Sequence, residues 1–134
     1  MDITKIQDEK AQEDVGIDVP IVRRDGEPDL ASDGTQTTFT VVGRNSSRVK
    51  RVIERQARQN ARRRADLKFD EVYEQRVERA IAALIDWHGV EENGAPVALT
   101  PDAARAVLSD PHYLEQVEDG MVSHGRFFKT ASAS

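Results

Sequence analysis

The chain has 134 residues and no cysteine, which gives room for one small domain and excludes disulfides and thiolate metal sites. Hydrophobic residues make up 38% and charged residues 32%, so little apolar material is left for a deep catalytic cleft. The formal net charge is -5, yet residues 44–64 carry nine Lys or Arg and one acid, which leaves -13 for the other residues. An acidic protein therefore contains one strongly basic segment.

Residues 1–18 form an acidic, polar N-terminal segment without a clear hydrophobic period. Their charge has the wrong sign for a secretory signal peptide, and they offer no apolar face to a core. No apolar run in the chain approaches the roughly 20 residues that a membrane helix needs. We predict a flexible leader over residues 1–18 and a soluble, cytoplasmic protein without membrane partners.

Residues 19–43 have the pattern of a small β unit. The segment VPIVRRDGEPD combines a short strand with a turn signal at Asp25-Gly26, and GTQTTFTVVG provides a second strand. In the second strand Phe39 and Val41 alternate with threonines, which is typical of a half-buried strand. A hairpin or small sheet of this size needs support from a helix or from another copy of the chain.

A basic helix is predicted over residues 46–64. Ser46 or Ser47 is suited to cap it, and apolar residues recur behind the cap at helical spacing. This narrow apolar stripe consists of Val49, Val52, Ile53, Ala57 and Ala61. Most of the remaining positions are Arg or Lys, so the helix is expected to present a basic surface.

The strongest helical pattern covers residues 70–88. Asp70 and Glu71 suit the positive end of its dipole, and Gly89 suits the position after its last turn. The apolar face of this predicted helix comprises Val72, Tyr73, Val77, Ala80, Ile81, Leu84, Ile85 and His88. Residues 90–99 contain an Asn93-Gly94 turn and favour a tiny hairpin.

Two short helices follow, each opened by a capping residue and a proline. Thr100-Pro101 opens a helix over residues 101–109, and Asp110-Pro111 opens another over residues 111–122. Residues 124–134 are predicted to be a flexible C-terminal tail. The expected architecture is an α+β fold in one domain, residues 19–123, with a small N-terminal β-hairpin or sheet followed by a bundle of about four α-helices.

No group of residues in the sequence has the spacing of a catalytic or metal site. The three histidines, His88, His112 and His124, lie in different predicted elements and match no metal-ligand spacing. Carboxylates such as Glu71 and Glu74 lie on helix faces, where solvated surface is their ordinary role, and no glycine-rich phosphate loop occurs. We therefore expect a protein that is not an enzyme and uses no cofactor or metal.

The basic helix has three alternative partners. It could neutralise nucleic-acid phosphates, pair with the acidic residues from Asp70 onward, or meet an acidic surface of another copy of the chain, head to tail. Nucleic acid is the least favoured, because the helix lacks interleaved aromatic residues and the surrounding charge of -13 repels a polyanion. The candidate protein-binding residues on this helix are Arg48, Arg51, Arg55, Arg58 and Arg62.

Three aromatic residues are further candidates for protein binding. Trp87 either seals the end of its predicted helix against the helices that follow or contacts a groove of a partner. Phe127 and Phe128 are adjacent in a polar tail, so they are either a docking element or a contact with the core.

The order of these segments resembles the small tail assembly chaperones of tailed bacteriophages. An acidic leader, a β unit ending in GRNSSRVKR, a basic helix and an apolar helix ending in ALIDWHG succeed one another as in that family. The resemblance covers roughly residues 19–129, and Asn45 stands where the family's strand-to-helix junction would have an acid. The family's pattern is carried by Trp87, Gly89, Glu92, Asn93, Gly94, Pro96, Thr100, Pro101, Asp102, Asp110, Pro111, Leu114, Gln116 and Val117.

The resemblance implies a non-enzymatic factor that binds the tape measure protein, keeps it soluble and helps to recruit subunits of the tail tube protein. It also implies the host cytoplasm as location, absence from the mature virion and, in many such phages, a longer product made by translational frameshifting. Self-association is compatible with this role. Two alternatives stay open: another phage morphogenesis or minor virion structural protein of the head-tail connector type, and a small DNA-binding regulator using the basic helix over residues 48–64.

Overall fold

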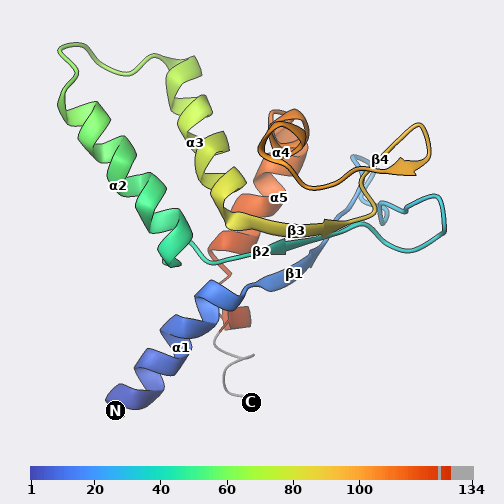
Figure 1. Cartoon of the computed structure of the whole chain (residues 1–134), viewed down its shortest axis with the longest axis horizontal. Helices are drawn as coiled ribbons and strands as arrows, with labels where there is room; N and C mark the ends of the chain where they lie inside the picture. Colours follow the sequence, from blue (N-terminus) through green and yellow to red (C-terminus); the bar gives the residue numbers. More distant parts are fainter. Residues whose placement is uncertain (124, 128–134) are drawn as a thin grey trace.

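A three-stranded antiparallel sheet lies at the centre of the molecule (Figure 1). The structure is a computed structural model that describes residues 1–123 and 125–127. The predicted α+β class is confirmed, and the turn at Asn93-Gly94 does form a small hairpin. The strands of the sheet, in spatial order, are β1 (Ile17–Pro20), β2 (Thr38–Val41) and β3 (Leu84–His88), and the hairpin consists of β4 (Glu91–Glu92) and β5 (Ala95–Pro96).

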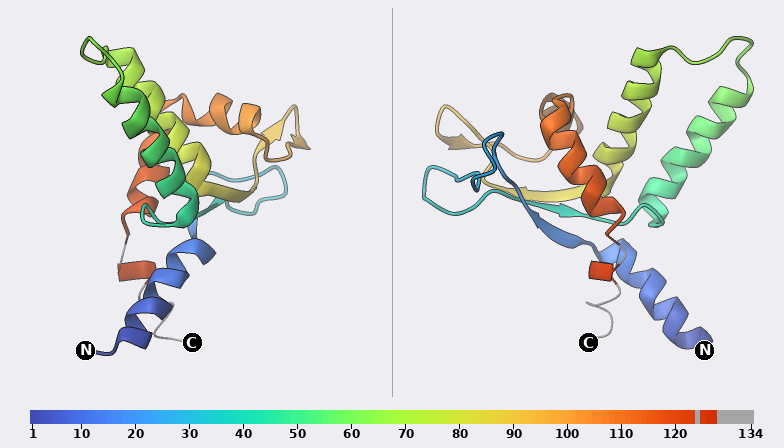
Figure 2. Two further views of the ribbon diagram at one scale, coloured as in Figure 1. Left: turned by 60° about the vertical axis from the view of Figure 1, so that its left-hand side comes forward. Right: turned by 180° about the vertical axis from the view of Figure 1, so that it is seen from behind.

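Four of the described helices form one group, in which α3 contacts α2, α4 and α5. These are the four helices that the sequence predicts after the β unit. Seen from behind, α5 crosses one face of the sheet, while α2 and α3 form a hairpin that projects beyond the strands (Figure 2). The helices are α1 (Ile3–Val15), α2 (Ser47–Ala61), α3 (Phe69–Ala83), α4 (Pro101–Leu108) and α5 (Pro111–Met121).

The sheet has one apolar face and one polar face, because side chains alternate along each strand. Phe39 lies between Val19 and Trp87 in the strand register and is fully buried, as is Val41 on the same strand. The alternation predicted for β2 is therefore confirmed. Helix α5 covers the apolar face so closely that a Cβ added to Gly120 would come 2.8 Å from Cγ2 of Val19.

The loop between β1 and β2 is organised by a three-way backbone junction. The amide of Ile21 donates to the carbonyl of Thr37 (2.9 Å), Thr37 donates to Asp29 (2.8 Å), and Asp29 donates back to Ile21 (2.9 Å). Two short turns leave this junction, one reversing the chain at Gly26 and the other at Gly34, both with positive φ. A 17-residue connection is thereby held by main-chain hydrogen bonds rather than by a long hairpin.

The prediction of a flexible leader over residues 1–18 is wrong for most of that segment, which forms helix α1 and the start of β1. Asp2 caps α1 by accepting a hydrogen bond from the amide of Thr4. At its other end the carbonyl of Glu13 accepts from the amide of Gly43 (2.9 Å), and Asp14 accepts from the amide and hydroxyl of Ser47. These long-range contacts fix a helix that the local hydrophobic pattern does not indicate.

The predicted helix over residues 70–88 is also wrong at its end, because the chain leaves the helix at Ala83 and continues directly as β3. Apolar residues at 84, 85 and 87 fit a helix and a strand about equally. Hydrogen bonding to β2 stabilises the strand. The register shifts between Thr40 and Val41, which adds Ile85 as an extra residue on β3. Gly89 therefore follows a strand, with φ of 92°, and does not cap a helix.

Three of the predicted helix starts are confirmed by their capping contacts. Ser46 caps α2, Thr100 caps α4 and Asp110 caps α5, each accepting a hydrogen bond from an amide in the first turn, and proline occupies the next position in α4 and α5. The gap between the predicted basic and apolar helices is present, with α3 beginning at Phe69, but the basic helix predicted over residues 46–64 already ends at Ala61.

Candidate protein-binding surface

Five arginines form one stripe along α2. Positions spaced by three or four residues lie on the same side of a helix, so the predicted site residues of α2 share one side. We call this set the arginine stripe: Arg48, Arg51, Arg55, Arg58 and Arg62, the last being the C-cap residue. The opposite side of α2 faces α3 through the buried Val49 and Gln56.

Two members of the arginine stripe are held by α3. Nε of Arg48 donates to the carbonyl of Ala82 (2.9 Å), and Arg55 pairs with Glu78 (2.6 Å). Outside the stripe, Arg63 pairs with Glu71 (2.5 Å). The alternative in which the basic helix pairs with the acidic residues from Asp70 onward is therefore confirmed for part of its charge.

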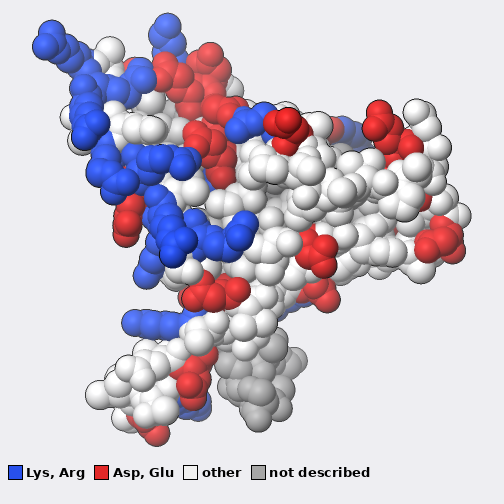
Figure 3. All heavy atoms as spheres, in the orientation of Figure 1, with Lys and Arg blue, Asp and Glu red and all other residues white. Residues whose placement is uncertain are grey.

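The other three members of the stripe carry charge that the fold does not neutralise. The side chains of Arg51, Arg58 and Arg62 are exposed, and their guanidinium groups make no hydrogen bond or ion pair with any other residue that the structure describes. Lys and Arg side chains form a continuous ridge along the α2 edge of the molecule (Figure 3). Unpaired charge at helical spacing is the property expected of a surface for a complementary partner.

A shallow apolar groove of about 300 Å³ begins beside Arg48. Its floor is formed by the buried Leu84 and Ala104, and half-buried aliphatic side chains line its walls. We define it by Arg48, Ile81, Leu84, Ile85, Leu99 and Ala104 and call it the Arg48 groove. In Figure 3 a largely uncharged area lies between the basic ridge and the loops at the other end of the molecule.

Sequence reasoning missed this groove because it placed Ile81 and Ile85 on the core face of one continuous helix. The bulge in β3 and the turn of the chain at Ala83 leave both residues only partly covered. The apolar and polar residues alternate from Ile85 to His88, as in a strand, but these four residues are too few to outweigh the helical spacing before them.

Trp87 is a structural anchor within the chain. Its indole N–H donates to the carbonyl of Val97 (2.8 Å), and its ring lies 5.9 Å from that of Phe39, centroid to centroid. The sequence predicts that Trp87 either seals a helix end against the following segments or contacts a partner. The structure shows the first kind of contact, but Trp87 lies on a strand and not at a helix end. Trp87 is half-buried and fixes the segment that leads to α4.

Of the two roles predicted for Phe127, the contact with the core is the one found, and the prediction of Phe127 as a protein-binding residue is wrong. Its side chain is fully buried and belongs to the same core as Phe39 and Val117. The polar residues around it in the sequence hide this role, because only the return of the chain to the sheet brings Phe127 against the core. Phe128 lies outside the described residues, and so does most of the predicted tail over residues 124–134.

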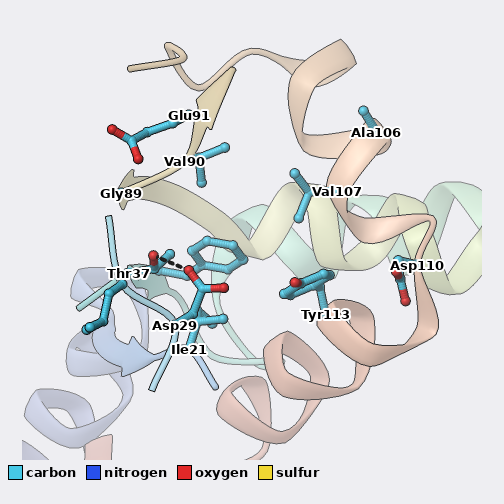
Figure 4. Close-up of a pocket in the computed structure, with 12 residues that line it drawn as sticks. Ile21, Asp29, Thr37, Gly89, Val90, Glu91, Ala106, Val107, Asp110 and Tyr113 are labelled. Carbon is cyan, nitrogen blue, oxygen red and sulfur yellow. Dashed lines mark hydrogen bonds between the residues drawn. The ribbon is translucent and has the colours of Figure 1, made fainter. Parts of the chain in front are cut away.

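A pocket of about 370 Å³ lies between the β1–β2 loop and α4, and several carboxylates line it (Figure 4). Its acids are engaged: Asp29 accepts from the hydroxyl of Thr37 (2.6 Å), and Glu91 accepts from Ser32. Figure 4 places Asp29 and Asp110 on opposite walls with Tyr113 between them. The carboxylates of Asp29 and Glu91 therefore hold together the loops that line the pocket.

The two described histidines form contacts with the β1–β2 loop. Nε2 of His88 lies 2.6 Å from the hydroxyl of Thr35, and Nε2 of His112 lies 2.8 Å from the carbonyl of Val22. His124 lies outside the described residues. Within residues 1–123 and 125–127 no three His, Asp or Glu side chains gather in the manner of a metal site.

Perturbed pKa values occur at structural contacts. The pKa of Asp110 is lowered chiefly by the hydrogen bond from the amide of His112, and Arg24 adds to this by pairing with the carboxylate. The pKa of Arg76 is raised by its bidentate hydrogen bonds to Glu118, at 2.6 and 3.0 Å, which tie α3 to α5. Burial lowers the pKa of Arg79, whose guanidinium donates to Gln56.

Comparisons with known proteins identify no relative: no family model, curated protein or solved structure matches this chain. None of the helices in the described part of the chain combines the length and the apolar character that crossing a membrane requires. The evidence for function is therefore the geometry of the arginine stripe and the Arg48 groove, together with the predicted resemblance to phage tail assembly chaperones.

Proposed function

We propose that this chain is a non-enzymatic tail assembly chaperone of a tailed bacteriophage, which binds the tape measure protein in the host cytoplasm. In this role it keeps a long helical client from aggregating, helps to recruit tail tube subunits and is left out of the mature virion. The resemblance in the sequence motivates the proposal, and the site geometry is compatible with it.

One observation carries the proposal: Arg51, Arg58 and Arg62 are unpaired on a helix whose first turn borders an apolar groove at Arg48. A surface with both charge and apolar side chains fits an elongated protein client better than a small substrate. The pocket between the β1–β2 loop and α4, in contrast, is lined by Asp29 and Glu91, which already accept internal hydrogen bonds.

The residues that carry the resemblance have structural tasks that a shared fold would explain. Thr100 and Asp110 cap α4 and α5, and Trp87 anchors the segment before α4. Gln116 accepts a hydrogen bond from the amide of Val22 and donates one to its carbonyl, which ties α5 to the β1–β2 loop. These residues therefore hold α4, α5 and the β1–β2 loop in place.

Co-expression with the tape measure protein tests the proposal. We expect this chain to raise the soluble yield of a long helical tape measure protein severalfold, and we expect purified mature particles to lack it. A tape measure protein that stays equally insoluble would contradict the proposal. Stoichiometric amounts of this chain in purified virions would instead support the virion structural alternative.

A further inference from the structure

We infer that the arginine stripe and the Arg48 groove bind one and the same ligand: an amphipathic helix with carboxylates along one flank and aliphatic side chains on its apolar face. The inference rests on the proposed function only in taking the client to be helical. It goes further by stating the chemistry that the client must present and the residues that recognise it.

The two features form one continuous surface because Arg48 belongs to both. Arg48 begins the stripe on α2, and its contact with the carbonyl of Ala82 holds it at the edge of the groove. From Arg48 to Arg62 the stripe extends about 21 Å, at the helical rise of about 1.5 Å per residue. A partner helix of four turns would match this length.

The charge of the surface selects an acidic partner. Arg51, Arg58 and Arg62 repeat at spacings of seven and four residues, so carboxylates on a helix at similar spacing could meet them in register. The acids of α3 that are nearest the stripe are engaged elsewhere, since Glu71 pairs with Arg63 and Glu78 with Arg55. The single acid of α2, Glu54, cannot neutralise three arginines. The partner must therefore bring its own carboxylates.

The groove selects an aliphatic side chain. Leu84 and Ala104 are buried beneath it, while Ile81, Ile85 and Leu99 each keep part of their surface exposed. Covering this surface with Leu or Ile from the partner removes apolar area from water on both sides. A nucleic-acid strand offers phosphates to the arginines but no aliphatic group for this groove.

The test uses the full chain and three fluorescently labelled helical peptides of about four turns. The first has a leucine stripe flanked by glutamates, the second replaces the glutamates with lysines, and the third replaces the leucines with alanines. By fluorescence anisotropy we expect the first peptide to bind at least tenfold more tightly than either of the others. Equal affinity for the glutamate and lysine peptides would overturn the inference.

Neighbouring positions on α2 supply a matched pair of variants. Arg51→Glu reverses a charge on the stripe, whereas Lys50→Glu makes the same change on a different side of the same helix. We expect Arg51→Glu to weaken binding of the leucine-glutamate peptide about fivefold to tenfold and Lys50→Glu less than twofold. An equal loss in both variants would mean general attraction rather than this surface, and it would overturn the inference.

The groove is tested in the same way, with circular dichroism to confirm that each variant is folded. Leu99→Ala removes a wall of the groove, and Leu30→Ala removes an exposed leucine elsewhere. We expect only Leu99→Ala to weaken binding of the leucine-glutamate peptide, by about threefold to tenfold, since one side chain loses its apolar contacts. Unchanged binding to a folded Leu99→Ala variant would overturn the role of the groove.

Two further results would assign the surface to another partner and overturn the inference. One is a concentration-dependent oligomer, seen by sedimentation, that Arg51→Glu dissolves, because the occupant would then be a second copy. The other is displacement of the bound peptide by duplex DNA at about 200 mM salt. Failure of the peptides with continued rescue of the tape measure protein would reject this inference alone, whereas peptide binding without rescue would reject the proposed function.

Discussion

The helical arm of this protein, residues 47–83, and the sheet covered by α5 are held together by different forces. Beneath α5 the contacts are apolar and closely packed, with Phe39, Leu114 and Val117 almost or fully excluded from water. In the outer half of the arm, Gln56 and Asn60 of α2 meet Gln75 of α3 through side-chain hydrogen bonds. Ion pairs flank this polar contact.

The difference separates the part that maintains the fold from the part available for recognition. Exposed ion pairs add little to stability, and a polar contact between helices must be satisfied group by group. The arm can thus carry unpaired arginines at small cost, because Val49 and Val77 pack near the sheet and none of the three unpaired arginines is buried.

The largest effect is expected from Phe127→Ala in the core. Phe127 is fully buried, so its truncation should lower the free energy of unfolding by about 3 kcal/mol. The matched control is Phe69→Ala in the arm, where the side chain is 87% exposed and a change within about 0.5 kcal/mol is expected. Urea unfolding followed by the fluorescence of Trp87 measures both, and equal effects would contradict the division.

A smaller loss is expected from Gln56→Ala within the arm. The side-chain amide of Gln56 donates to the carbonyl of Gln75 (3.0 Å) and accepts from Arg79 (2.8 Å), and it is buried. Removing it leaves both partners without these bonds, which should cost about 2 kcal/mol. The exposed Gln59→Ala on the same helix serves as the control. A loss no larger than that of the control would show that the polar contact does not hold the arm.

Acid pH should reveal a still smaller contribution, that of Asp110 at the start of α5. Because its pKa in the folded state lies below its ordinary value of 3.8, the carboxylate stabilises the fold above that pH and loses this effect as the pH falls through the lowered pKa. Asp110→Asn keeps a capping side chain but loses the charge facing Arg24. The difference in urea midpoint between wild type and variant should therefore shrink from pH 7 to pH 3, and a difference that grows would contradict this account.

The sequence predicted those parts of the fold that are encoded locally. The caps at Ser46, Thr100 and Asp110 and the alternation around Phe39 each depend on a few neighbouring residues, and all are found in the structure. The strand at the end of the apolar helix depends on pairing with β2, which lies more than 40 residues earlier, so a local pattern could not decide it.

The candidate site was predictable to a similar degree. Helical spacing alone places the five arginines on one side of α2, but which of them are paired depends on where α3 lies. The burial of Phe127 and the Arg48 groove both depend on contacts between distant segments. The local sequence therefore predicted the arginine stripe, whereas the Arg48 groove is visible only in the folded structure.

The smallest effect on stability is expected from the three unpaired arginines. Arg51→Glu, Arg58→Glu and Arg62→Glu together should change the free energy of unfolding by less than about 1 kcal/mol, because these side chains are exposed and make no ion pair with another described residue. Urea unfolding of the triple variant checks this. A loss comparable to that of Phe127→Ala would mean that the stripe maintains the fold.

The same triple variant provides the most direct test of the central claim, that the arginine stripe recognises a client and is not needed for folding. Soluble tape measure protein is measured after co-expression with wild type, with the triple variant and with Lys50→Glu. The account predicts that the folded triple variant loses most of the soluble yield that wild type supports, while Lys50→Glu retains it. A folded triple variant that supports the wild-type yield would contradict the account.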